Sequence, residues 1–226
     1  MGYLSFFLSS LLVLATLDGI LAVEYVVTNR AETTRGGARF NNELGVDYTK
    51  QTMVSASNFI WNIFQQSNEA ERKSVPRVSL IVEVMEGIAY AINNEIHVGA
   101  GYIEGIKGDI KTDFNGVLYH EMTHIWQWPG SNTPRSRNLT EGIADFVRLK
   151  ANYVPDGWVQ PGGGSHWDAG YSVTARFLDY CNGLKDGFVA ELNKKMRTGY
   201  NDNYFVELLG KTADQLWSEY KARYGN

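Results

Sequence analysis

Residues 112 to 128 form the segment whose structure the sequence restricts most. Its apolar residues recur at three- and four-residue spacing and no proline interrupts them, which predicts a helix with one apolar side. These residues are Phe114, Val117, Leu118, Ile125 and Trp126. Pro129 and Gly130 follow and end the helix. The rest of the chain must therefore provide a core against which this helix packs.

The same helix carries two of the four histidines, His120 and His124, with Glu121 directly after the first. Side chains four residues apart leave one side of a helix about one turn apart, so both imidazoles can reach one ion. This H-E-x-x-H arrangement is typical of zinc peptidases, where Zn2+ lowers the pKa of a bound water to about 7 and polarises the peptide carbonyl. Glu121 is then the expected general base, and a peptide or protein is the expected substrate.

Two histidines leave a catalytic zinc ion one protein ligand short. A third histidine inside an extended motif requires glycine at position 127 and histidine at position 130. The chain has Gln127 and Gly130, which excludes that class. Glu141 lies 17 positions after His124, at the start of the next predicted helix, and is the expected third ligand.

Asp145 follows Glu141 by four residues on the same helix side, where it can accept the distal N–H of a ligating histidine and fix its orientation. This E-x-x-x-D pair resembles the third-ligand helix of thermolysin-like gluzincins. The competing interpretation makes both residues first-turn acids favoured by the helix dipole, with Asn138 or Thr140 as N-cap. Asp145 or His166 is the substitute if Glu141 is not the third ligand.

The order of predicted elements indicates the fold class. A β-branched run begins at residue 24 and leads into a loop, residues 47–67 predict a helix, and residues 78–103 predict a small sheet with a hairpin at Asn93-Asn94. Further helices are expected at 139–153, 169–182, 186–197 and 212–223, with a glycine-rich loop at 154–164. Strands first and helices after predict an α+β fold: a small mixed sheet with an edge strand over a zincin-like helical zinc site, and a helical C-terminal half. No linker or repeat interrupts residues 23–226, which we interpret as one domain.

Residues 1–22 predict a secretory signal peptide. No charged side chain occurs through Leu17, and Asp18 interrupts an apolar run shorter than the about 20 residues that span a bilayer. Ala22 supplies a small residue for cleavage, and an uncleaved anchor is the alternative. We expect a secreted, extracellular monomer without membrane contact after cleavage. Loss of Asp18 changes the net charge from -4 to -3, and no basic patch favours nucleic acid.

Cys181 is the only cysteine, so a secreted form has no intrachain disulfide and depends on its core. The apolar helical pattern around Cys181 predicts a buried structural thiol. Asn138-Leu139-Thr140 is the single N-glycosylation sequon, and its use at Asn138 requires an exposed loop.

Several segments together resemble the plant basic secretory protein family. They are TNRAETTRGGARF, IHVGAGYI, YHEMTHIWQW, EGIADFVRLKANYVP and HWDAGYSVTARFLDYCN, spread over most of residues 24–185. The resemblance implies a secreted, pathogenesis-related, gluzincin-like zinc metallopeptidase of extracellular plant defence, in the apoplast or cell wall. It carries over His120, His124 and Glu141 as zinc ligands and Glu121 as general base. The sequence pI of 5.6 departs from the family's basic character, so retention in the wall by positive charge is not carried over.

The oxyanion of the transition state needs a hydrogen-bond donor besides the metal, usually a tyrosine or histidine outside the ligand helices. His166 and Tyr171 are the catalytic candidates, and the alternatives are an exposed loop histidine and a core aromatic residue. The stretch EIHVGAGYI is expected to be the sheet edge on which an extended substrate adds as a strand.

Two other functions stay open at this point. The first is a secreted defence or wall-binding protein whose zinc site is structural or inactive. The second is a glycan-binding module that uses some of the six tryptophans and 13 tyrosines.

Overall fold

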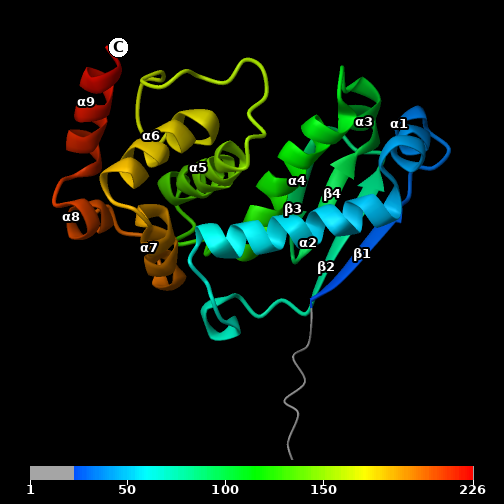
Figure 1. Ribbon diagram of the computed structural model, residues 1–226, viewed down its shortest axis with the longest axis horizontal. Helices are drawn as coiled ribbons and strands as arrows, with labels where there is room; N and C mark the ends of the chain where they lie inside the picture. Colours follow the sequence, from blue (N-terminus) through cyan, green and yellow to red (C-terminus); the bar gives the residue numbers. More distant parts are fainter. Residues whose placement is uncertain (1–22, 226) are drawn as a thin grey trace, which may run out of the picture.

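The computed structural model of the chain describes residues 23–225, and Figure 1 shows the sheet at one end of the molecule and the C-terminal helices at the other. The predicted signal peptide lies outside the described residues. Within them, no helix is long and apolar enough to cross a membrane. The α+β class with a small mixed sheet and a helical C-terminal half is confirmed.

Four strands form the sheet in the order β1 (Glu24–Asn29), β2 (Arg77–Glu83), β4 (Glu95–Gly99), β3 (Ala89–Ile92). The β1–β2 and β2–β4 pairs are parallel, whereas β3 is antiparallel to β4. Asn93 and Asn94 join β3 to β4 with φ of 50° and 62°, the left-handed conformation of a two-residue hairpin turn. The predicted hairpin at these two asparagines is therefore confirmed.

The prediction that EIHVGAGYI forms the sheet edge is wrong. The hairpin places β3 outside β4, so β4 is paired on both sides and β3 is the edge strand at this end of the sheet. The strand also ends at Gly99, and α3 (Ala100–Gly105) replaces the expected extended backbone. The segment that leads into β3 crosses close to the end of β4. A Cβ on Gly99 would lie 2.6 Å from the Gly87 carbonyl oxygen, which leaves no room for a side chain there.

Two long helices cover one side of the sheet. The helix α2 (Gly45–Ile63) contacts β1, α4 (Ile110–Trp126) contacts β3, and the two helices contact each other. Their apolar sides bury the alternate strand residues Val78, Leu80 and Val82. The indole of Trp126 donates to Ser57 of α2, which joins the two helices inside the core.

A short helical segment replaces the loop expected between β1 and α2. It comprises α1 (Arg35–Arg39) and a π-helical turn, Phe40–Leu44. A Cβ on Gly36 would lie 1.8 Å from the carbonyl oxygen of Ala100, so the segment packs directly on the α3 backbone. The lack of a side chain at Gly36 thus permits a close helix contact.

The C-terminal half is helical, with α5 paired against both α4 and α6 (Figure 1). Its elements are α5 (Pro134–Lys150), α6 (Tyr171–Leu184), α7 (Phe188–Lys195), α8 (Tyr204–Leu209) and α9 (Ala213–Tyr224). The helix α8 was not predicted. Cys181 is fully buried in α6, as expected for a structural thiol.

The start of α5 corrects the predicted boundary at residue 139. Thr133 is the N-cap, its side chain accepts from the Ser136 amide, and Pro134 occupies the first helical position, where its missing N–H has no cost. Glu141 therefore lies well inside the helix, and its interpretation as a first-turn acid is wrong. Asn138 is also helical and donates to the Asp168 carbonyl at 2.9 Å, so the sequon is not in the exposed loop that its use requires.

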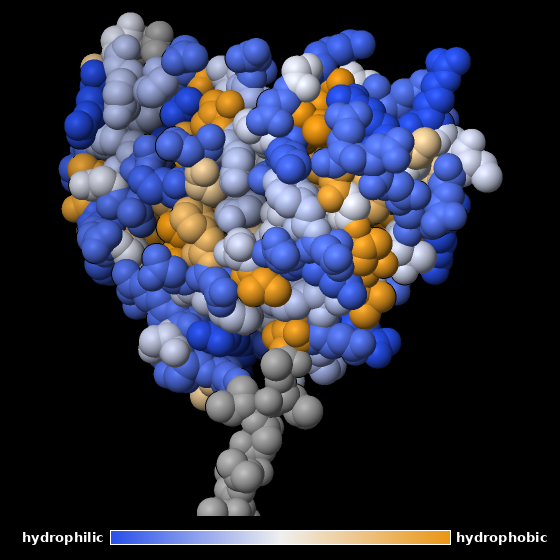
Figure 2. All heavy atoms as spheres, turned by 45° about the vertical axis from the view of Figure 1, so that its right-hand side comes forward, coloured by the Kyte–Doolittle hydropathy of each residue, from blue (hydrophilic) through white to orange (hydrophobic). Residues whose placement is uncertain are grey.

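The tryptophans give no support to an aromatic sugar-binding face. All six tryptophans are buried or partly buried. The face in Figure 2 is mainly hydrophilic, with small separate hydrophobic patches.

Candidate metal centre and cleft

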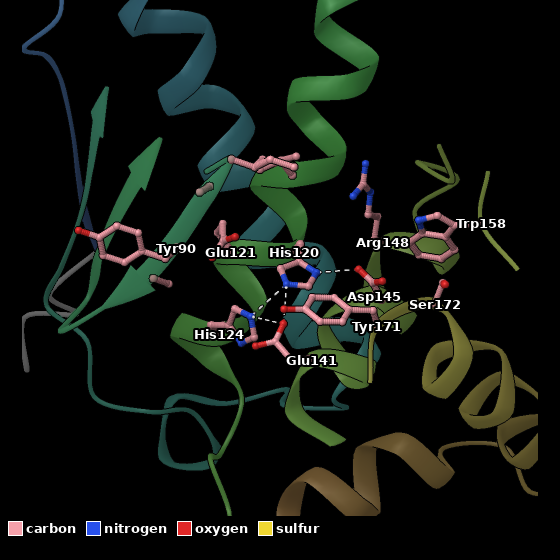
Figure 3. A pocket seen from close by; sticks show the side chains of 14 residues that line it. Tyr90, His120, Glu121, His124, Glu141, Asp145, Arg148, Trp158, Tyr171 and Ser172 are labelled. Atoms are coloured by element: carbon pink, nitrogen blue, oxygen red, sulfur yellow. Dashed lines mark hydrogen bonds and ion pairs between the residues drawn. The ribbon is translucent and has the colours of Figure 1, made fainter. Parts of the chain in front are cut away.

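Adjacent sides of α4 and α5 bring the predicted site residues together. His120, Glu121 and His124 come from α4, and Glu141 and Asp145 come from α5 (Figure 3). His120 and Glu121 are only 8% and 6% exposed, so the protein and not solvent provides most of their surroundings.

Three ligand-type atoms converge at this point. Nε2 of His120 lies 3.1 Å from Nε2 of His124 and 3.2 Å from a carboxylate oxygen of Glu141. That oxygen is 3.5 Å from Nε2 of His124. The two imidazoles and the carboxylate could therefore hold one metal ion. Asp145 and His166, the substitutes considered for Glu141, are not part of this group.

Asp145 is the hydrogen-bond partner of His120 at Nδ1. Nδ1 of His120 donates to Asp145 at 2.7 Å, so Nε2 faces Glu141 and His124. Burial alone would lower the pKa of His120, but hydrogen bonds to Asp145 and Glu141 outweigh it and raise the pKa to about 9. For Glu141, burial alone would raise the pKa. Its hydrogen bonds to the two histidines outweigh burial and hold the pKa of the carboxyl well below its usual range. The cluster therefore favours a positive charge between its carboxylates, whether a proton or a metal ion supplies it.

His124 has a partner that the sequence did not indicate. The Gln127 carboxamide, at the C-cap of α4 and 3% exposed, lies 2.6 Å from Nδ1 of His124. Gln127 Oε1 is buried and has no hydrogen-bond partner. The carboxamide Nε2 also donates to the Thr140 carbonyl at 3.2 Å, so Gln127 joins the ring of His124 to α5.

Glu121 lies on the same side of the cleft as the two histidines. Burial raises the pKa of its carboxyl, while the nearby His120 and His124 oppose the rise. A carboxyl whose pKa moves toward neutrality can both accept and return a proton. This property suits the general-base role expected from the sequence.

Tyr171 also lies at the site. Its ring is parallel to that of His120 with centroids 6.1 Å apart, and its hydroxyl points toward the Glu141 carboxylate (Figure 3). The side chain is 58% exposed, so the alternative of a core aromatic residue is wrong. Its φ of 44° is unusual for a tyrosine and sets the start of α6. Burial and the nearby acids raise the pKa of the phenol, which keeps it a hydrogen-bond donor.

His166 does not lie at the site. It is exposed, its Nδ1 is 2.9 Å from Asp168, and it lines a separate surface hollow with Arg135 and Asp202. The structure thus corresponds to the alternative interpretation of an exposed loop histidine.

The cluster opens into a cleft of about 640 Å³. The edge strand β3 and the preceding Ile88 form one wall, α4 and α5 form the floor, and Trp158 and Tyr171 stand opposite. Arg148 and Trp158 are two lining residues that sequence reasoning missed. The spacing of Arg148, seven residues after Glu141 on one helix side, was the available signal.

Comparisons with known proteins point to one family. The sequence model of a family described as peptidase of plants and bacteria matches residues 20–220. A basic secretory protease of Boswellia serrata is 54% identical over 59 residues, which are 26% of this chain and 67% of that protein. No solved structure matches the chain.

Proposed function

The chain belongs to the basic secretory protein family of plant and bacterial peptidases, and from that premise we propose that it is a secreted zinc-dependent metallopeptidase. The observation that carries the proposal is the convergence of His120, His124 and Glu141 beside Glu121 in an open cleft. The zincin-like character of the site is part of the same proposal.

The geometry of the three ligand atoms fits zinc. Zinc bonds of about 2.0–2.1 Å in a tetrahedron place neighbouring ligand atoms about 3.3 Å apart. The three distances in the cluster are 3.1, 3.2 and 3.5 Å. Two imidazole nitrogens and one carboxylate oxygen are also a usual donor set for a catalytic zinc ion.

When bound, zinc lowers the pKa of a water molecule and polarises the substrate carbonyl. The chain's own residues carry out the proton transfers. Glu121 accepts a proton from the attacking water, and a C–O bond to the peptide carbonyl carbon forms. Glu121 then returns that proton to the leaving nitrogen as the C–N bond breaks, so one water is consumed for each peptide bond.

Tyr171 and β3 complete the arrangement. The protonated phenol of Tyr171, beside the ligands, donates a hydrogen bond to the carbonyl oxygen as negative charge develops on it. The free edge of β3 lines the cleft, so an extended peptide can add there as a further strand. This role replaces the one expected for EIHVGAGYI.

Extracellular defence in the apoplast or cell wall is the proposed setting, with residues 1–22 as the signal peptide and a monomer as the secreted form. The name of the Boswellia relative, a basic secretory protease, supports secretion. A purely structural zinc site is the less favoured alternative, because such sites are closed by four protein ligands. Here three ligands face a cleft that also contains Glu121.

The test compares wild-type protein with Glu121→Gln. We expect wild type to cleave a peptide library, a chelator to abolish cleavage and zinc to restore it. Glu121→Gln should keep about one zinc per chain and lose at least 10²-fold in kcat, because only the proton acceptor is removed. Wild type that binds zinc but cleaves nothing would instead support the structural or inactive site.

A further inference from the structure

Arg148 is the sole lysine or arginine among the described residues that line the cleft. It follows Asp145 by one helical turn of α5. Its guanidinium packs on Gly116 of α4, where a Cβ would lie 2.7 Å from Nε and 2.8 Å from Nη2. Gly116 thus leaves room for the guanidinium one helical turn before His120.

The guanidinium has no acidic partner within the part of the chain that the structure describes. Its Nε donates to the Tyr153 carbonyl at 2.9 Å, and its central carbon lies 5.7 Å from the centre of the Trp158 ring. Asp145 on the same helix side is held by His120, and Asp113 accepts from Tyr102. The remaining guanidinium N–H groups are therefore available to a ligand.

The space around Arg148 is open. Arg148 and Ile88 line the cleft and also a second hollow of about 860 Å³ at the N-terminal end of α4. The cleft thus continues past the guanidinium, with Trp158 as an apolar wall. A half-buried cation fixed by a carbonyl and an aromatic ring is ordered before a ligand arrives.

We propose that Arg148 and Trp158 form a subsite that binds a carboxylate of the substrate close to the scissile bond. The planar guanidinium offers two parallel N–H donors to one carboxylate. Gly116 and His120 are about 6 Å apart along α4, and an extended peptide advances about 3.3–3.6 Å per residue. The carboxylate therefore belongs to a residue within one or two positions of the reacting carbonyl.

This inference rests on the proposed peptidase function, and it names the substrate class of that same cleft. Two sources supply the same chemistry: an aspartate or glutamate side chain, or the terminal carboxylate of a short peptide. Two peptide series distinguish them. One series places Glu or Gln at each of two positions on either side of the cleaved bond, and the other carries a free acid or an amide at its C-terminus.

For wild type, we expect kcat/KM to favour the carboxylate over its amide about ten-fold or more in one of the two series. In Arg148→Gln this ratio should fall to near one. Arg148→Lys should give an intermediate ratio, because it keeps the charge but loses the planar fork. A wild-type ratio near one in both series would overturn the subsite.

Arg176 provides a matched control. It is a half-buried arginine on α6 whose Nε donates to the Val159 carbonyl at 3.2 Å, so it holds the same loop as Arg148 without lining the cleft. Arg176→Gln should keep the wild-type preference for the carboxylate. An equal loss of preference in Arg176→Gln would mean that loop anchoring, and not carboxylate binding, is responsible.

A binding measurement separates this inference from the proposed function. Calorimetry on zinc-loaded Glu121→Gln should show tighter binding of the carboxylate peptide than of its amide, and this difference should vanish in Glu121→Gln/Arg148→Gln. If wild type cleaves nothing but this difference is present, the peptidase proposal fails and the subsite stands. If wild type cleaves without any preference and the binding difference is absent, the subsite fails and the peptidase proposal stands.

Discussion

The Gln127 carboxamide lies 2.6 Å from Nδ1 of His124, and the residue is buried, with 3% of its surface exposed. It contacts Nδ1 of His124, as Asp145 contacts Nδ1 of His120. Each candidate histidine ligand therefore has its own orienting partner, one from the end of α4 and one from α5. Partners of this kind set both the tautomer and the basicity of a ligating imidazole.

Replacing Gln127 with leucine should lower zinc affinity by about 10–100-fold, because His124 then loses the group that fixes its ring. A competition titration with a zinc indicator measures the change. Gln66→Leu is the matched control, since Gln66 is also buried, with an unpaired Oε1, but lies outside the site. Equal zinc affinities of wild type and Gln127→Leu would refute the orienting role.

The metal-free protein should lose stability as the pH rises from 6.5 to 9. The folded chain raises the pKa of His120 from 6.5 to about 9, so the stability from its protonated form is complete below pH 6.5 and disappears as the pH rises through the folded value. The loss amounts to at most about 3 kcal/mol in the free energy of unfolding. Urea denaturation with a chelator present, at several pH values, measures it.

Asp145→Asn should flatten this pH dependence, because the variant lacks the carboxylate that favours the imidazolium. Added zinc should also flatten it, since the ion replaces the Nε2 proton. A metal-free wild type as stable at pH 9 as at pH 6.5 would contradict the charge arrangement described for the cluster.

Tyr171→Phe should lower kcat by about 10²–10³-fold while zinc content stays unchanged, because a donor to the developing oxyanion is lost. Steady-state kinetics on one peptide and metal analysis of the same preparations provide the measurement. Tyr224→Phe removes another exposed phenol, on α9, and serves as the control. Undiminished kcat in Tyr171→Phe would dismiss the tyrosine from the reaction.

Sequence reasoning succeeded where local periodicity determines structure. The spacing of His120 and His124 on a helix, and of Glu141 and Asp145 on the next, is a local property, and the structure places all four side chains together. Their roles as ligands and orienting group remain predictions. The hairpin turn at Asn93-Asn94 also depends on the local sequence, because two consecutive residues in the left-handed conformation define it.

Features that depend on contacts between distant segments were missed. The segment around Gly36 is helical where a loop was expected, and no residue near Gly36 in the sequence indicates its close contact with the Ala100 backbone. Arg148 becomes a cleft residue because Gly116 of another helix leaves space for it. His166 and Tyr171 were both donor candidates, yet Tyr171 begins α6 beside the cluster and His166 lines a separate surface hollow.

Packing between α5 and α6 holds Tyr171 over the cluster, and Gly142 makes that packing possible. A Cβ on Gly142 would lie 2.2 Å from Cγ2 of Thr174. Thr174 cannot easily turn away, because it is fully buried and its hydroxyl donates to the Trp167 carbonyl. Gly142→Ala must therefore push α6 away from α5.

We expect Gly142→Ala to lower the free energy of unfolding by about 1–3 kcal/mol and to lower kcat as well, since α6 carries Tyr171 away from Glu141. Gly183→Ala is the control on α6: its added Cβ meets no atom within 4 Å, and helix propensity should stabilise it by about 0.5–1 kcal/mol. Urea denaturation and steady-state kinetics measure both effects. If Gly142→Ala were as stable and as active as Gly183→Ala, the α5–α6 contact would not be what positions Tyr171, and the strained start of α6 would have to hold the ring by itself.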